Sequence, residues 1–318
     1  MTEALVVVST LILVGVLVKK SKVLSDEADR GLLTLVINVL LPCFIFSKVV
    51  GNESVKDPQN MLYAPLAGFL GVAVPIFLCL FLARYVFKLK AFKDETTQRT
   101  FAFATGLQNY GYIAIPVIDK VFGGDLLGMM VLHNMGVELA IWSIGITVLS
   151  GELNRSSWKR LINGPFIAVI LSLFLNVSGG DQLVPAALAD VIAQIGAAFI
   201  PLGVILVGTT VFTLCHKSNF FSKTFKEGMG IVLLGNLLRS GIIPLIIIGM
   251  AMIFPYSLEL QKVIIIEAAM PAAFSTIIYS KHYHGKPEVA LQISMTSLAV
   301  GIILLPVWVS IGKSLLNL

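Results

Sequence analysis

Long, nearly continuous apolar stretches recur along the whole chain and are separated by short polar segments. Each is close to the roughly 20 helical residues that cross a hydrocarbon core of about 30 Å. They are too long and too continuously apolar for the alternating strands of a membrane barrel. The predicted spans cover residues 3–18, 31–50, 61–87, 100–118, 126–149, 164–178, 186–214, 229–254, 258–280 and 287–316. The pattern therefore predicts an all-α membrane protein with ten transmembrane helices.

Composition supports a lipid environment and excludes a separate soluble domain. The 318 residues are 57% hydrophobic and only 13% charged, whereas soluble domains are about 45–50% apolar and about 25% charged. The formal net charge of +5 is spread over short loops. It therefore does not indicate a nucleic-acid partner, because such a surface needs clustered basic residues.

The Lys and Arg residues predict how the bundle is oriented. Alternate loops hold 17 of them on one side and five on the other, and Arg239 lies within a span. The positive-inside rule places the richer side in the cytoplasm. We therefore expect a multi-pass protein of the cell (inner or plasma) membrane, with both termini extracytoplasmic.

Recurring prolines suggest an internal repeat. Pro42 in the second span and Pro201 in the seventh are 159 residues apart, and Pro116 in the fourth and Pro271 in the ninth are 155 apart. These offsets predict two copies of a five-helix unit, residues 1–150 and 164–318. Because five is odd, the copies would insert with opposite orientations, as in secondary transporters whose sites form from broken helices. Each proline alone could instead be a simple kink, so the pairing of positions carries more weight than any one proline.

The fourth span contains the segment GLQNYGYIAIP, from Gly106 to Pro116. Glycine and proline here coincide with polar side chains, which predicts a break whose backbone groups face a ligand. The expected substrate-binding residues are Gln108, Asn109, Tyr110, Gly111 and Pro116. The alternative is tight helix packing, with the amides bonded to neighbouring helices.

The ninth span contains a matching segment, IIIEAAMPAAF, in which Glu267 precedes Pro271. A carboxylate within a span is costly unless it is paired, protonated or bound to a cation. We expect Ala269, Met270 and Pro271 to contribute to the substrate site and Glu267 to cation coupling. The alternative places Glu267 near the outer interface, where it would be solvated.

Polar residues in two further spans are additional candidates. Asn134 and Glu138 are i, i+4 neighbours in the fifth span and share a face with Trp142, with His133 beside it. They indicate either a substrate and cation path, with Asn134 on the substrate and Glu138 joining Asn109 and Glu267 in coupling, or an interhelical clamp. Arg239 in the eighth span either attracts a carboxylate or a glutamate, or snorkels to the cytoplasm. No cofactor and no metal beyond sodium is expected.

Three segments resemble the auxin efflux carrier family, which includes plant auxin exporters and bacterial malate and malonate permeases. They are LVINVLLPCFIFSKV, GLQNYGYIAIPV and AAMPAAFSTIIYS, and the resemblance covers essentially the whole chain. The short loop at residues 150–163 is similar to that of the bacterial branch. The resemblance implies a fold related to the bile acid sodium symporters, with crossed broken helices four and nine.

The resemblance also implies two domains, a scaffold and a transport domain that moves against it. A scaffold of about residues 1–60 and 164–215 would hold a transport domain of about 61–150 and 216–318, which moves like an elevator. In the bile acid symporters a glutamate of helix nine and polar residues of helix four hold sodium, and Glu267 and Asn109 occupy similar places. A homodimer would form through the scaffold helices.

The sequence thus predicts a secondary transporter of a small organic anion, coupled through Glu267 to sodium or protons. The anion would be a dicarboxylate such as malate or malonate, or an auxin-like carboxylate. A sodium/proton antiporter is the alternative. An intramembrane enzyme is more remote, because the chain contains neither GxSxG nor HExxH.

Overall fold

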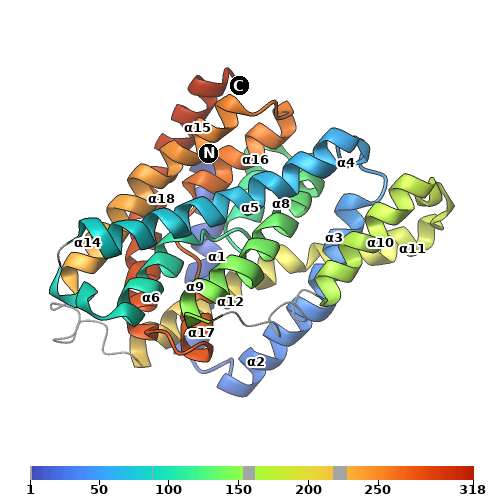
Figure 1. Cartoon of the computed structure of the whole chain (residues 1–318). Coiled ribbons are helices and arrows are strands. Elements are labelled where there is room, and N and C mark those ends of the chain that lie inside the picture. Colours follow the sequence, from blue (N-terminus) through green and yellow to red (C-terminus); the bar gives the residue numbers. More distant parts are fainter. Residues whose placement is uncertain (1, 88, 153–161, 218–227) are drawn as a thin grey trace.

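A computed structural model describes residues 2–87, 89–152, 162–217 and 228–318 (Figure 1). The described residues form helices joined by short connections, with one isolated β-bridge and no sheet. The all-α prediction is therefore confirmed. Some residues that contribute to the predicted cytoplasmic charge lie outside the described residues, namely Lys88, Arg155, Lys159, Arg160, Lys223 and Lys226.

Six helices are long and apolar enough to cross a membrane, judged by length and composition. They correspond to the second, third, fifth, seventh, eighth and tenth predicted spans. Their bounds are Asp26–Val49, Pro58–Val86, Gly124–Ser150, Ala186–Thr213, Met229–Ile253 and Pro287–Leu316. Helices α1 (Thr2–Lys20) and α10 (Gly164–Ser178) match the first and sixth predicted spans.

Most of the long spans consist of shorter helical pieces joined end to end. The second contains α2 (Asp26–Leu35), η1 (Val36–Leu40) and α3 (Leu41–Val49), and the third α5 (Pro58–Phe81) and η2 (Leu82–Val86). The fifth contains α8 (Leu127–Ala140), η5 (Ile141–Gly145) and α9 (Ile146–Ser150). The seventh joins α11 (Ala186–Ala197) to α12 (Phe199–Lys217), and the eighth joins α14 (Met229–Leu237), η8 (Leu238–Ile242) and α15 (Ile243–Ile253). Elements η1, η2, η5 and η8 are π-helical turns, which locally re-aim side chains.

The helix is interrupted within the fourth and ninth predicted spans. Helix α6 (Glu95–Gly106) is separated from α7 (Ala114–Phe122), and α16 (Leu258–Ala269) from α17 (Ser275–His282). Leu107 and Met270, which follow the first pieces, have extended backbone with ψ of 116° and 143°. Both predicted helix breaks are therefore present.

The two prolines that suggested the second repeat offset do not occupy equivalent places. Pro271 lies within the break of the ninth span, whereas Pro116 lies inside α7. The first pieces end at Gly106 and Ala269, an offset of 269 − 106 = 163 residues. The offset of 155 residues thus relates non-equivalent positions. Pro42 and Pro201 both lie in the first turn of a helical piece, α3 and α12.

Side-chain caps determine where several helices begin. The cap satisfies a backbone N–H group that the first helical turn leaves unpaired. The capping residues are Ser25 for α2, Asp57 for α5, Asp94 for α6, Asn163 for α10 and Ser257 for α16. The cap at Asp94 explains why α6 begins at Glu95, five residues before the predicted start at residue 100.

Two sets of helices can be distinguished by their contacts, and they meet where α1 packs against α7 and α3 packs against α8. In one, α1 packs against α12, and α3 packs against α10 and α11 (Figure 1). In the other, α5 packs against α6 and α8, and the C-terminal helix α18 (Pro287–Leu316) packs against α6, α14, α16 and α17. Helix α16 also contacts α15, so α18 and α16 bring both broken spans into the second set.

Close contact between α5 and α8 depends on glycine. A Cβ atom built on Gly136 would overlap the carbonyl oxygen of Pro65, and one on Gly68 would overlap that of His133. These glycines let the two backbones approach, as small residues do between membrane helices. The position of α8, and of the polar side chains that it carries, depends on this approach.

We predict that Gly136→Ala destabilises the protein by about 1–3 kcal/mol, because the added methyl group must push α8 away from α5. Thermal unfolding in detergent measures the change. The control is Gly71→Ala on α5, where a Cβ atom meets nothing within 4 Å. Equal melting temperatures for the two variants would contradict the packing account.

An ion pair links the start of the fourth span to the start of the tenth. Lys286 Nζ lies 2.7 Å from Asp94 Oδ2, and the Lys286 backbone N–H donates to Thr100 Oγ1 at 3.0 Å. Asp94 also accepts hydrogen bonds from the backbone N–H and hydroxyl of Thr97, at 2.9 and 2.5 Å. Lys286, followed by Thr97, lowers the pKa of Asp94 to about 2.

We predict that Asp94→Asn lowers the melting temperature at neutral pH, because it keeps the cap but removes the ion pair. A lowered folded-state pKa contributes stability that is present above the unfolded value of about 3.9 and lost as pH falls toward 2. The difference from wild type should therefore disappear between about pH 4 and pH 2, and shrink in high salt. A difference independent of both pH and salt would contradict this interpretation.

Candidate functional site

The two interrupted spans meet at their breaks. The Asn109 N–H donates to the Pro271 carbonyl at 2.8 Å, and the Ala273 N–H donates to the Leu107 carbonyl at 3.0 Å. Gln108 and Ala272 form the isolated antiparallel bridge between these bonds. Two extended segments therefore pair across the interior of the helix bundle. Here each break supplies hydrogen bonds that the other has lost.

Helix α8 holds the first break from one side. Asn134 Nδ2 donates to the Tyr110 carbonyl at 2.9 Å, and the Tyr110 hydroxyl donates to Glu138 Oε1 at 2.5 Å. The indole of Trp142 donates to Glu138 Oε2 at 2.8 Å. His133 Nδ1 lies 3.2 Å from Asn134 Oδ1. The polar stripe predicted in the fifth span is thus a hydrogen-bonded clamp on the fourth.

Helix α18 holds the second break through hydroxyl groups. Ser297 Oγ accepts from the Ala272 N–H at 3.0 Å, and Ser294 Oγ donates to the Ala273 carbonyl at 3.1 Å. Gly301 lies against the Pro271 ring. The sequence analysis did not predict these contacts. Small hydroxyl residues in an apolar span look the same whether they bond a helix break or only fill space between helices. The run SMTS at residues 294–297 is the signal that could have pointed to them.

Glu267 lies in the last turn of α16, directly before the second break. Its side chain is 1% exposed, which contradicts a solvated position at the outer interface. Neither carboxyl oxygen has a hydrogen-bond partner. The Gln108 side chain lies beside this carboxyl group, and its own Oε1 is likewise unpartnered. Carboxyl and amide oxygens without partners are suitable ligands for a sodium ion or a proton.

Arg239 lies near Glu267, within the π-helical turn η8. Its side chain is 0% exposed, so snorkelling to the cytoplasmic surface is contradicted. Its Nη2 donates to the Ala268 carbonyl at 3.0 Å. That carbonyl belongs to the C-terminal end of α16, where helix carbonyls lack intrahelical partners. The arginine therefore stabilises the end of the half-helix.

The other predicted site residues lie around the crossing. Asn109 is 4% exposed, and its Oδ1 accepts from the Ile113 N–H at 3.4 Å. Ala269 and Met270 are buried at the end of α16, and Gly111 lies in the first break. Pro116 is buried two residues into α7 and so stands apart from the paired segments.

Tyr112 is a residue of the first break that the sequence did not single out. Its ring centroid lies 6.4 Å from that of Phe199 in α12, and the ring packs on Gly203 of the same helix. The first break therefore contacts the set of helices that contains α1, α3, α10, α11 and α12. Because aromatic residues are common in membrane helices, Tyr112 had no distinguishing signal in the sequence.

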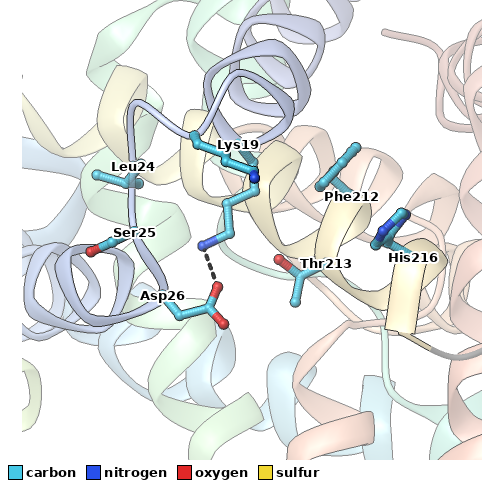
Figure 2. Close-up of a pocket in the computed structure, with 8 residues that line it drawn as sticks. Lys19, Leu24, Ser25, Asp26, Phe212, Thr213 and His216 are labelled. Carbon is cyan, nitrogen blue, oxygen red and sulfur yellow. Dashed lines mark ion pairs between the residues drawn. The ribbon is translucent and has the colours of Figure 1, made fainter.

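A pocket of about 350 Å³ lies elsewhere, among the ends of α1, α2 and α12 (Figure 2). Lys19 lines it, and its Nζ lies 2.8 Å from Asp26 Oδ1 and 3.1 Å from Asp29 Oδ2. Thr209 donates to the other oxygen of Asp29 at 2.8 Å. This network ties α1, α2 and α12 together. The pocket contains none of the predicted site residues.

The crossing can recognise a ligand through peptide groups, amides and one carboxyl group. Each break is followed by the N-terminus of a half-helix, α7 or α17, whose partial positive charge favours an anion. No group of three or more His, Cys, Asp or Glu residues with metal-binding geometry occurs in the described part of the chain.

Comparisons with known proteins place the chain among membrane transporters. Residues 1–309 match the model of a family described as membrane transport protein. An uncharacterized transporter of Methanothermobacter thermautotrophicus is 22% identical, covering 96% of this chain and 97% of its own. One from Methanocaldococcus jannaschii is 23% identical, covering 88% and 89%. One from Saccharomyces cerevisiae is 38% identical, but over only 19% of this chain and 11% of its own.

The family match spans nearly the whole chain, and the two archaeal relatives align along almost their full lengths. The protein is therefore a multi-pass membrane transporter and not an enzyme, which removes the intramembrane-enzyme alternative. The chain belongs to the membrane transport protein family, the family of the auxin efflux carriers.

Proposed function

We propose that this transporter is a secondary carrier for a small carboxylate, bound where the two interrupted spans cross. The observation that carries the proposal is the pairing of Asn109 with Pro271 and of Ala273 with Leu107. It brings irregular backbone and two half-helix N-termini together inside the bundle, the arrangement that secondary transporters use for anions. Malate and malonate, or an auxin-like carboxylate, are the candidate substrates.

The proposed architecture has ten spans in two inverted five-helix units, residues 1–150 and 164–318. The six long helices, together with α1, α10 and the two interrupted spans, supply ten apolar segments. Proposed, too, is an orientation with both termini outside the cytoplasm, which rests on the distribution of Lys and Arg. A homodimer would use the scaffold helices, where the exposed side chains of α10 and α11 include Phe174 and Val191.

The two packing sets support an elevator-type mechanism. The set with α1, α3 and α10–α12 corresponds to the proposed scaffold, and the set with α5–α9 and α14–α18 to the transport domain. Because the crossing is held mainly by α8 and α18 of the second set, it would move with that set as one body. Tyr112 against Phe199 is part of the surface along which the sets would slide.

Coupling to sodium or protons is the proposed role of Glu267. The carboxyl group is buried and unpartnered, whereas both oxygens of Glu138 already accept hydrogen bonds. This difference favours Glu267 over Glu138 as the coupling residue and gives Glu138 a structural role. An anion entering a negative-inside cell meets an adverse potential of about 2.3 kcal/mol per charge per 100 mV. Uptake would therefore need accompanying cations, whereas export would not.

Sodium/proton exchange without an organic solute is the second candidate, because an unpartnered buried carboxyl could serve it equally. Proteoliposomes with an internal pH dye distinguish the two. Proton flux driven by a sodium gradient in the absence of carboxylates would favour the antiporter. Carboxylate flux that depends on the cation gradient would favour the carrier.

We predict that Asn109→Ala lowers malonate or indole-acid flux in proteoliposomes by about tenfold or more, equivalent to about 1.4 kcal/mol. The change removes the amide that accepts from Ile113 beside the paired backbone. The control is Asn38→Ala, because Asn38 is exposed on η1 and bonds only locally to Thr34. Unchanged flux in Asn109→Ala would overturn the assignment of the site.

We predict that Glu267→Gln removes the dependence of flux on sodium and pH, since the amide can neither ionise nor carry a proton. Initial rates are measured across sodium concentrations and pH values. Glu259→Gln, in the first turn of the same helix, is the control that should retain both dependences. Ion dependence that survives Glu267→Gln would show that coupling occurs elsewhere.

A further inference from the structure

Arg239 is a cation held entirely inside the protein with hydrogen-bonding capacity to spare. Its side chain is 0% exposed, and only Nη2 has a partner, the Ala268 carbonyl at 3.0 Å. The Nε and Nη1 atoms have none. A hydrogen bond holds the π-helical turn that carries Arg239 against α18. In it, the Trp308 indole donates to the carbonyl of the next residue, Ser240, at 2.7 Å. An unpartnered buried cation is costly, so a role beyond the single helix-end contact is expected.

Glu267, the residue before Ala268 in α16, has hydrogen-bond acceptors without donors. Both carboxyl oxygens are buried without partners, and the guanidinium of Arg239 is near enough to interact with them electrostatically. The two side chains nevertheless form no hydrogen bond with each other. Opposite charges are thus placed close together, with free donors on one and free acceptors on the other.

Few other ionisable groups face this pair. On α5, the Cys79 thiol faces Arg239, and from the first break the Gln108 amide faces Glu267. On α8, His133 contacts Asn134, and Glu138 bonds to Tyr110 and Trp142. Helix α15 contains no ionisable residue, and those of α6, α7 and α18 lie near the helix ends, at Glu95, Arg99, Asp119, Lys120, Glu288 and Lys313. Glu259 and Lys262 of α16 itself lie toward the start of that helix, and Arg239 is the cation that interacts electrostatically with Glu267.

We propose that Arg239 is an internal counter-ion, which pairs with the Glu267 carboxylate whenever no coupling ion occupies it, so that the carrier can return across the membrane without cargo. The inference rests on the proposed role of Glu267 in coupling. An uncompensated carboxylate is expensive to move within hydrocarbon, whereas a neutral ion pair is less so. When sodium or a proton neutralises Glu267, the guanidinium keeps the Ala268 carbonyl at the negative end of the α16 dipole. Arg239 acts through Glu267 and is a positioning residue.

The test compares two modes of malonate transport in proteoliposomes. Exchange of labelled for unlabelled malonate uses only the loaded carrier, whereas net efflux also requires the empty carrier to return. We expect Arg239→Gln to lower net efflux by about tenfold at neutral pH without sodium, while exchange stays within about twofold of wild type. Mild acid or added sodium should restore net efflux. Arg239→Lys, which keeps the charge, should retain most of it.

The double variant Arg239→Gln/Glu267→Gln separates pairing from folding. With both charges gone, we expect net efflux to recover and its pH dependence to disappear. If Arg239→Gln lowers exchange and net efflux equally, or changes neither, the counter-ion role is wrong. If instead Glu267→Gln alone leaves ion dependence intact, the coupling proposal fails.

Thermal unfolding in detergent tests the pair without any substrate. In a double-mutant cycle, Arg239→Gln should destabilise the protein more when Glu267 is present than when it is Gln, and acid should reduce that excess. Additive effects at every pH would mean that the two side chains do not interact. That result would overturn the counter-ion proposal whatever the carrier transports.

Discussion

Two backbone hydrogen bonds at the crossing make the interrupted spans tolerable in lipid. Unpaired peptide groups in hydrocarbon cost several kcal/mol each, so irregular backbone at membrane depth must find partners within the protein. Asn109 with Pro271 and Ala273 with Leu107 provide them reciprocally. Because each break satisfies the other, neither span can re-form a continuous helix independently. This pairing therefore determines where the half-helix ends and the side chains around them lie.

The surrounding polar residues fall into two groups, those whose hydrogen bonds hold the breaks and those that keep unpartnered atoms. Asn134, Glu138 and Trp142 on one side, and Ser294 and Ser297 on the other, use their hydrogen bonds to hold the breaks. Gln108, Arg239 and Glu267 instead retain unpartnered atoms in the interior. A satisfied network rigidifies its site, whereas unsatisfied buried groups are costly and indicate function. The proposed cation coupling therefore involves the second group, whereas the paired backbone and Asn109 form the proposed substrate site.

The sequence predicted the six long apolar spans, because a lipid-facing helix must be apolar over its whole length. It also located both breaks, since glycine, proline and polar side chains coincide there. The burial of Arg239 could not be predicted, because a long side chain ten residues into a span reaches either the interior or the interface. The roles of Tyr112 and Ser297 depend on which helices pack together, a tertiary feature without a local pattern. The equivalence of Pro116 and Pro271 was wrong because proline tolerates both a break and the first turn of a helix.

The most direct test of the central claim is a cryo-electron microscopy structure of the full chain in nanodiscs with malonate. The account predicts ligand density at the crossing, within hydrogen-bonding distance of Asn109 or of the peptide groups that flank the paired segments. Density confined to the pocket around Lys19, or anywhere remote from the two breaks, would contradict it.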